Sequence, residues 1–273
     1  MKRLINYKPS PMSQMWLGLL PFIILLFLYI YASDLRLTAN PDDKLLPAFA
    51  TLGDSIHRLA LEENQRSGAI LLWSDTAASL KRLTLGIGIS AFLGLVVGIA
   101  TGAMPLLRAN LSPLVAVLSM VPPMALLPIL FIVFGLGEVS KVVLIVIGIA
   151  PFIMRDMSQR VMELPKEQLI KAQTLGGSTW LIILRVILPQ ILPRLIDAVR
   201  LSLGAAWLFL IAAEAIASTD GLGYRIFLVR RYLSMEIILP YVAWITLLAY
   251  LFDLVMRQFS KRCFPWFEGG AKA

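Results

Sequence analysis

Apolar residues run through most of this chain in stretches long enough to cross a membrane. A helix needs about 20 mostly apolar residues to span roughly 30 Å of hydrocarbon. Six stretches approach that length: Met15–Ala32, Leu83–Leu107, Leu111–Gly137, Val139–Met154, Leu195–Ala217 and Ile237–Phe252. The pattern predicts an all-α integral membrane protein with about six transmembrane helices.

The distribution of basic residues predicts how these helices are oriented. Six crossings place both termini on one side, and Lys and Arg collect in loops that stay in the cytoplasm. The start of the chain and residues 155–194 are basic, whereas the longest loop on the other side, residues 33–82, has no basic excess. We therefore expect both termini in the cytoplasm. The first apolar run is longer than the apolar core of a signal peptide, so we expect it to be an uncleaved span.

Composition supports the membrane assignment and narrows the chemistry. Apolar residues make up 58% of the chain and charged residues 15%, against about 45–50% and 25% in soluble domains. The net charge of +8 fits basic loops, and no RNA-reading motif accompanies it, so no nucleic-acid partner is expected. With one Cys and one His, an intramolecular disulfide and a Cys- or His-based metal cluster are excluded, and we expect no metal site.

Two of the predicted spans have features beyond their length. Gly94, Gly98 and Gly102 recur every four residues in the second span, which predicts a smooth stripe buried against another helix. Pro122 and Pro123 interrupt the third span and predict a kink. Unpaired carbonyls at that depth are tolerated in protein or beside water, so the kink either lines a pathway or is purely structural.

Glu214 is the deepest acid in the outer half of the fifth span. An intramembrane carboxylate is costly and indicates a functional site by default, although it could instead be hydrated near the surface or cap the turn that follows. Asp197 and Arg200, three residues apart, are expected to pair with each other. The candidate residues of a translocation pathway are Met120, Pro122, Pro123, Trp207 and Glu214.

The cytoplasmic segment Leu169–Pro189 is too charged and broken for a span and too apolar for an ordinary loop. Pro165 can start a helix, and Gly176-Gly177 can stop it at a sharp corner. Ser178 or Thr179 can then cap a second helix that runs up to Pro189. We call residues 169–189 the elbow and expect it to present a small apolar surface to a cytoplasmic partner.

No phosphate-binding G-x-x-x-x-G-K-[ST] motif occurs in the chain. Transport against a concentration gradient would therefore need energy from an ion gradient or from another subunit. An exposed elbow favours another subunit. The alternative of an ion-coupled secondary transporter or channel lacks a convincing internal repeat or a relay of buried ionisable residues. A membrane-bound enzyme lacks a clustered catalytic set.

The elbow resembles the cytoplasmic signature of binding-protein-dependent ABC importer permeases, which reads E-A-A, three residues, G, nine residues, I-x-L-P. Ala172, Gly176, Val186, Leu188 and Pro189 match it without a gap, whereas Ile170 and Lys171 replace the usual Glu and Ala. Blocks such as LSMVPPMALLPILFIVFGLGEVSK and LSLGAAWLFLIAAEAIASTDGLG are similar to the nitrate/sulfonate/taurine-type branch, and the similarity covers about residues 75–265.

The resemblance implies a type I ABC importer permease bundle in the bacterial inner membrane. It implies an ATPase-coupling loop at 160–190 that uses Ala172, Gln173, Leu175, Gly176, Gly177, Leu188 and Pro189. It further implies a permease homodimer, two cytoplasmic ATPases that bind ATP and Mg, and a soluble binding protein, with no cofactor or catalytic residue in this chain.

The division of the chain and the outer docking surface follow from the same resemblance. We expect an N-terminal helix and outer loop at 1–72, a permease core at 73–265 and a cytoplasmic tail at 266–273. Arg225, Arg230 and Arg231 would receive the binding protein, unless their segment lies in the lipid interface instead. The solute would be nitrate, a sulfonate such as taurine, or a small nitrogen compound.

Overall fold

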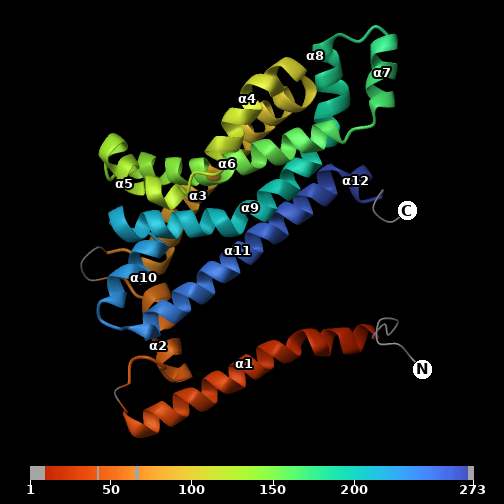
Figure 1. Ribbon diagram of the computed structural model, residues 1–273. Helices are drawn as coiled ribbons and strands as arrows, with labels where there is room; N and C mark the ends of the chain where they lie inside the picture. Colours follow the sequence, from red (N-terminus) through yellow and green to blue (C-terminus); the bar gives the residue numbers. More distant parts are fainter. Residues whose placement is uncertain (1–9, 42, 65–67, 270–273) are drawn as a thin grey trace. The chain divides into compact units, whose positions relative to one another are not determined.

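The computed structural model describes residues 10–41, 43–64 and 68–269, and no β-strand occurs among them. The residues that were expected at the extreme termini, 1–9 and 270–273, lie outside this description. The helices, drawn in Figure 1, are α1 (Pro11–Ala39), α2 (Phe49–Leu61), α3 (Leu71–Ala103), α4 (Pro105–Leu118), α5 (Pro123–Phe134), α6 (Glu138–Met162), α7 (Lys166–Thr174), α8 (Thr179–Ile182), a π-helical turn (Ile183–Ile187), α9 (Leu188–Ala217), α10 (Leu222–Arg230), α11 (Met235–Cys263) and α12 (Pro265–Gly269). The predicted all-α class is confirmed.

The chain forms two units, which are described separately. The first contains Met1–Glu62 and Val229–Pro240, and the second contains Glu63–Leu228 and Tyr241–Ala273. In the first unit the loop after α1 folds back on that helix. Tyr29 donates its hydroxyl to the Pro47 carbonyl at 2.8 Å and packs edge-on against Phe49, with ring centroids 5.3 Å apart. These contacts fix α2 beside the end of α1.

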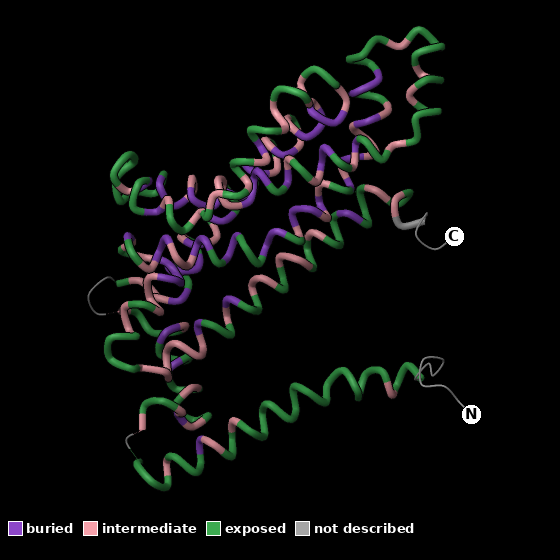
Figure 2. Tube along the Cα trace, viewed as in Figure 1, coloured by how far each residue is buried: buried purple, intermediate pink, exposed green. Residues whose placement is uncertain are grey.

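The core of the second unit lies where α6 packs between α3 and α9. Figure 2 shows most of the buried positions on these three helices. The face of α6 that includes Leu144, Ile145 and Ile153 is fully buried. Other residues of α6, such as Val139 and Phe152, are exposed, so the helix buries part of its surface in the core of the unit.

The glycine stripe predicted on α3 is confirmed as the surface on which α6 packs. A Cβ atom added at Gly94 would overlap Ile153 of α6, one at Gly98 would overlap Met157, and one at Gly102 would lie 2.5 Å from Cβ of Val161. The residues on both helices recur every four positions, so the two ridges run alongside each other. Small residues let the backbones approach closely, which is how helices associate in lipid.

The third predicted span, Leu111–Gly137, is wrong as one continuous helix. The chain breaks between α4 and α5, and the two helices are bent by 93°. Pro122 is the cap residue of α5 and Pro123 its first residue, a position where proline loses no hydrogen bond. The proline pair therefore starts a new helix instead of kinking an existing one.

The number of spans also differs from the six that the sequence predicts. Within the described residues, four helices are long and apolar enough to cross a membrane: α1, α3, the continuous Thr179–Ala217 helix and α11. The bent pair α4–α5 makes a fifth if it counts as one span. The fourth predicted span, Val139–Met154, lies within α6 at the centre of the second unit.

Candidate functional site

The elbow forms the predicted helix-corner-helix. Pro165 caps α7, and the helix ends where Gly176 adopts φ +80°. This left-handed conformation suits glycine because other residues place Cβ too close to the backbone. At Gly177 the backbone N–H donates to the Ala172 carbonyl at 3.0 Å, and a Cβ there would lie 2.8 Å from the same oxygen. Both glycines are thus required by the corner.

The second arm of the elbow begins at Ser178, whose hydroxyl accepts from the Leu181 N–H at 3.3 Å. The prediction that this arm ends at Pro189 is wrong. A π-helical turn, in which the Leu188 N–H donates to the Ile183 carbonyl, carries the chain into α9. Pro189 follows this turn as the second residue of α9, and the wider turn accommodates its missing N–H donor. The arm is therefore continuous with a membrane-spanning helix.

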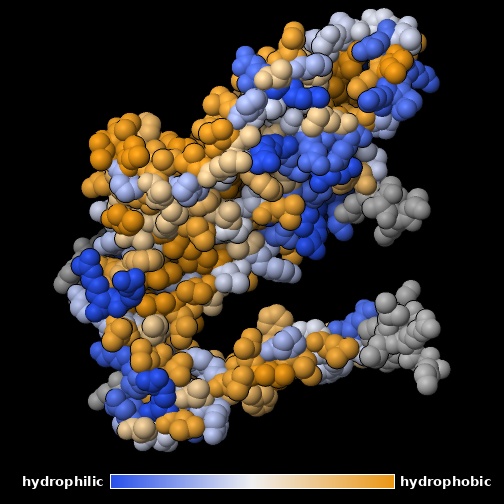
Figure 3. Space-filling model, in the orientation of Figure 1, coloured by the Kyte–Doolittle hydropathy of each residue, from blue (hydrophilic) through white to orange (hydrophobic). Residues whose placement is uncertain are grey.

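The outer surface of the elbow exposes large apolar side chains. Leu175 is 81% exposed, Trp180 67% and Ile170 57%. In Figure 3 hydrophobic side chains lie beside hydrophilic ones over α7 and α8. Of the predicted coupling residues, Gln173, Leu175 and Gly176 are exposed. Ile170 and Leu175 lie outside the membrane-length helices, so lipid does not account for their exposure, and Trp180 is the second residue of the Thr179–Ala217 helix.

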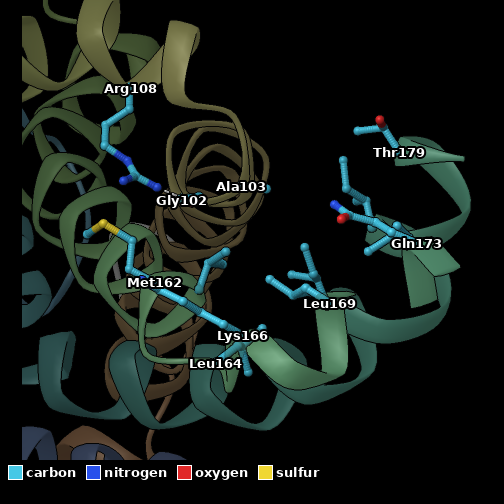
Figure 4. A pocket seen from close by; sticks show the side chains of 13 residues that line it. Gly102, Ala103, Arg108, Met162, Leu164, Lys166, Leu169, Gln173 and Thr179 are labelled. Atoms are coloured by element: carbon cyan, nitrogen blue, oxygen red, sulfur yellow. Dashed lines mark hydrogen bonds between the residues drawn. The ribbon is translucent and has the colours of Figure 1, made fainter. Parts of the chain in front are cut away.

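A cavity of about 470 Å³ lies behind the elbow, between α7–α8 and the ends of α3, α4 and α6. Figure 4 shows Leu169 and Gln173 on one side of it and Gly102 and Arg108 on the other. The Arg108 guanidinium donates to the carbonyls of Thr101 and Gly102. It thereby satisfies carbonyls at the end of α3 that have no partner within the helix.

The predicted pathway residues do not gather around one cavity. Met120 and Pro122 are exposed at the α4–α5 break, and Pro123 lines a second cavity of about 370 Å³ beside α6. Trp207 is buried on α9, and its Nε1 has no hydrogen-bond partner in the described part of the chain. Glu214 lies two turns further along α9. The structure thus brings the three residues of the break together and separates them from Glu214.

Glu214 is 0% exposed and has a full set of partners. Its carboxylate accepts from the Ser79 hydroxyl at 2.8 and 2.9 Å, from Nη1 of Arg82 at 2.7 Å and from the Gly223 N–H at 2.9 Å. At Gly221, with φ +112°, a Cβ would lie 2.5 Å from this carboxylate. Glu214 therefore fixes the turn between α9 and α10 onto α3, which agrees with its predicted alternative role at that turn.

Arg82 is the residue that the sequence analysis missed. It is 2% exposed, and besides Glu214 it donates to both oxygens of Glu138, at 2.7 Å each, and to Asp220 Oδ1 at 2.5 Å. We call Ser79, Arg82, Glu138, Glu214 and Asp220 the charged cluster. Arg82 reads as the charged boundary of an apolar run, and nothing in the sequence pairs it with acids 56 to 138 residues away.

The three arginines predicted to receive a binding protein have different environments. Arg225 pairs with the buried Asp75 at 2.8 Å, and the Tyr241 hydroxyl donates to the same carboxylate at 3.0 Å. Arg230 and Arg231 are exposed and belong to the first unit. Arg225 thus holds α10 against α3. The predicted pair of Asp197 and Arg200 is present at 3.1 Å, with Asp253 added at 2.7 Å.

A bundle of long apolar helices with an exposed helix-corner-helix defines the membrane-spanning component of a transporter. The family model for the binding-protein-dependent transport system inner membrane component matches residues 90–264. The chain belongs to this family and is a permease subunit of an ABC importer, as the elbow and the separated sequence blocks predict. This assignment does not favour the alternative of an ion-coupled secondary transporter or channel.

Individual relatives agree with the family. The chain is 38% identical to the taurine transport system permease protein TauC of Escherichia coli over 196 residues, and these residues make up 71% of each protein. It is 30% identical over 195 residues to the putative aliphatic sulfonates transport permease protein SsuC of Bacillus subtilis, again covering 71% of each. The fold is similar to a chain of the MetNI methionine ABC transporter in an inward-facing conformation, with a TM-score of 0.58 and 21% identity, covering 70% of this chain and 94% of that one.

Proposed function

We propose that a separate cytoplasmic ATPase drives this permease through the elbow. The observation that carries the proposal is the exposed apolar surface formed by Ile170 and Leu175, which lie outside the membrane-length helices, and by Trp180 at the start of the Thr179–Ala217 helix. An exposed apolar surface of this kind favours a protein partner. The partner would bind ATP and Mg, because this sequence has no phosphate-binding loop. The chain itself would need no cofactor and would catalyse no reaction.

Both arms of the elbow lead into the central helices of the bundle. The first arm follows α6 after a three-residue link, Glu163–Pro165, and the second runs without interruption into α9. A displacement of the corner is therefore transmitted to α9 as a whole, since a helix moves as a rigid body. An ATPase that binds one position of the elbow more tightly than another would shift the bundle between two states.

We further propose that two copies of the chain line the translocation pathway, each with one ATPase beneath it. The cavity beside the α4–α5 break is lined by Arg155, which is exposed in a single chain. A second copy of the chain would cover this residue. The helices would span the inner membrane, and both termini would lie in the cytoplasm. A soluble binding protein would deliver the solute to residues 219–236, with Arg230 and Arg231 as contact residues and Arg225 holding the segment in place.

The solute that we propose is a small organic sulfonate. The relatives named for taurine and aliphatic sulfonate transport support this class. A buried carboxylate in the pathway would oppose an anion, but the charge of Glu214 is matched by Arg82 and its oxygens are occupied by Ser79 and Gly223. This acid therefore does not argue against an anionic solute.

Replacing Gly176 with Val tests the elbow. A β-branched residue at φ +80° costs roughly 1–2 kcal/mol locally and distorts the corner, so coupled uptake of taurine by the assembled transporter should fall to background. The variant should still insert in the membrane, because Gly176 is exposed and contacts no core residue. Uptake and membrane content would be measured on the same vesicles.

Gly204→Val is the matched control. Gly204 lies in α9, is exposed, and a Cβ there would meet nothing within 4 Å. Its replacement should leave coupled uptake within twofold of the wild type. Normal uptake by the Gly176→Val variant would refute the elbow as the coupling surface.

A further inference from the structure

Arg155 on α6 lines the cavity beside the α4–α5 break. The cavity has a volume of about 370 Å³, and its polar lining comes from Ser119, Arg155, Asp156 and Gln159. Two aromatic side chains, Phe152 and Phe209, line it as well. This size and this mixture of apolar walls with a few polar groups are typical of sites for small molecules.

The charge of Arg155 has no carboxylate partner in the part of the chain that the structure describes. Its Nη1 donates to the Ser119 hydroxyl at 3.0 Å, and that hydroxyl in turn donates to the Ala116 carbonyl at 2.8 Å. By contrast, Arg82, Arg160, Arg200, Arg225 and Arg257 each form an ion pair with an acid. Arg155 is exposed in the single chain, and none of the described carboxylates neutralises its charge, so an anion bound in the cavity would provide the opposite charge.

The neighbouring acid does not supply that charge. Asp156 follows Arg155 in the chain, so the two side chains leave α6 in different directions. Its carboxylate lies 3.5 Å from Nε of Arg160. The cavity therefore presents the positive charge of Arg155, the carboxylate of the Asp156–Arg160 ion pair and the Gln159 amide, which can donate hydrogen bonds.

Arg155 lies one residue beyond the predicted span Val139–Met154, in the half of α6 that leads to the elbow. It lies seven residues before the end of the helix at Met162, about 10 Å at 1.5 Å per residue. From the start of the helix at Glu138 the distance is about 25 Å on the same scale.

A further cavity of about 310 Å³ adjoins the same side chains. Arg155 and Gln159 line both cavities, and the further one extends to Thr101 on α3 and Met162 at the end of α6. Its other polar lining residues are Ser112 and Ser158. The guanidinium thus lies where two hollows meet, on the side of the bundle that leads to the elbow.

We propose that Arg155 binds the oxyanion of the transported solute, with the Gln159 amide as an additional donor. A guanidinium presents parallel N–H groups that match two oxygens of a sulfonate or carboxylate. Phe152 and Phe209 contact the carbon part of the solute. This inference rests on the proposed function, because it assigns the solute-binding site of the same pathway.

The single cysteine of the chain makes a direct test possible. In a Cys263→Ser, Ser119→Cys double variant of the purified permease, the one remaining thiol lines the cavity. Labelling by the anionic sulfonatoethyl methanethiosulfonate should be faster than labelling by its cationic trimethylammonioethyl analogue. Taurine should slow both, whereas sodium chloride at the same ionic strength should not.

Arg155→Gln in this background should raise the taurine concentration needed for half-protection by about tenfold or more, the loss expected for a hydrogen bond to a charged group. Arg155→Lys, which keeps the charge without the fork, should give an intermediate shift. Arg257→Gln is the matched control, since it removes the same charge from an exposed site on α11, and it should change nothing. The wild-type chain, with its exposed Cys263, should show no protection.

Equal protection of the Cys263→Ser, Ser119→Cys variant with and without Arg155→Gln would overturn the assignment, and so would protection by chloride as strong as that by taurine. The assay uses neither ATP nor a partner protein. Its failure would therefore leave the elbow proposal intact, and loss of coupled uptake in the elbow variant would leave the oxyanion site intact.

Discussion

The charged cluster and the elbow lie at opposite ends of α9 and follow opposite rules. In the charged cluster the buried charges are paired within the chain: Arg82 donates to three carboxylates, and Glu214 receives three donors. In the elbow, Leu175 and Trp180 are apolar and exposed. Polar groups are buried at the end of α9 that joins the charged cluster, and apolar side chains are exposed at the end that joins the elbow.

The difference shows which end is complete in a single chain. Burying a charged group is costly unless it is paired and hydrogen-bonded, so the charged cluster can persist only as a finished, rigid connection among α3, α6, α9 and α10. Exposed apolar area is stabilised when a partner covers it. Changes in the charged cluster should therefore alter stability, and changes in the elbow should alter coupling.

The largest effect on stability is expected from Arg82→Ala. This variant leaves Glu214 buried without its counter-ion, and removal of one partner of a buried ion pair costs about 3–5 kcal/mol. The melting temperature in detergent and the yield of monodisperse protein should both fall sharply. Arg82→Lys, which keeps the charge, should recover part of the loss. A melting temperature equal to that of the wild type would contradict the view that the charged cluster holds the bundle together.

A smaller loss is expected from Glu214→Gln. The amide keeps the shape of the side chain and can accept from Gly223, but it removes the charge that Arg82 faces, at a cost of about 1–3 kcal/mol. Uptake of taurine, normalised to folded transporter, should stay close to the wild-type value. Loss of uptake with an unchanged melting temperature would show that the carboxylate serves the pathway. Glu214 would then have a functional role and not only a structural one.

The smallest effect on stability is expected from Trp180→Ser in the elbow. An exposed side chain without core contacts changes stability by within about 0.5 kcal/mol. Exposed aromatic residues at interfaces often contribute about 2 kcal/mol or more to binding, so affinity for the ATPase should fall roughly 30-fold. Co-purification of the ATPase with the variant would measure this, with Trp266→Ser, a change at another exposed tryptophan, as control. Unchanged co-purification would exclude Trp180 from the contact.

Much of the fold and of the elbow could be predicted because the signals are local. The apolar run lengths indicate membrane helices, and the repeat of Gly94, Gly98 and Gly102 indicates a packing face whatever helix lies on it. The corner at Gly176-Gly177 and the cap at Ser178 depend on residues within a few positions of each other. Such features follow from backbone conformation and helical period.

Other features depended on the tertiary structure because they join residues far apart in the chain. The partner of Glu214 is Arg82, 132 residues earlier, and the partner of Arg225 is Asp75, 150 residues earlier. That Arg155 has no carboxylate partner among the described residues is likewise visible only in the folded chain. A sequence shows which charges are present; packing decides which of them meet, because pairing requires proximity in space and burial sets the cost of failing to pair. The continuity of the elbow with α9 also depended on the tertiary structure, since only the folded chain shows a π-helical turn that accommodates Pro189.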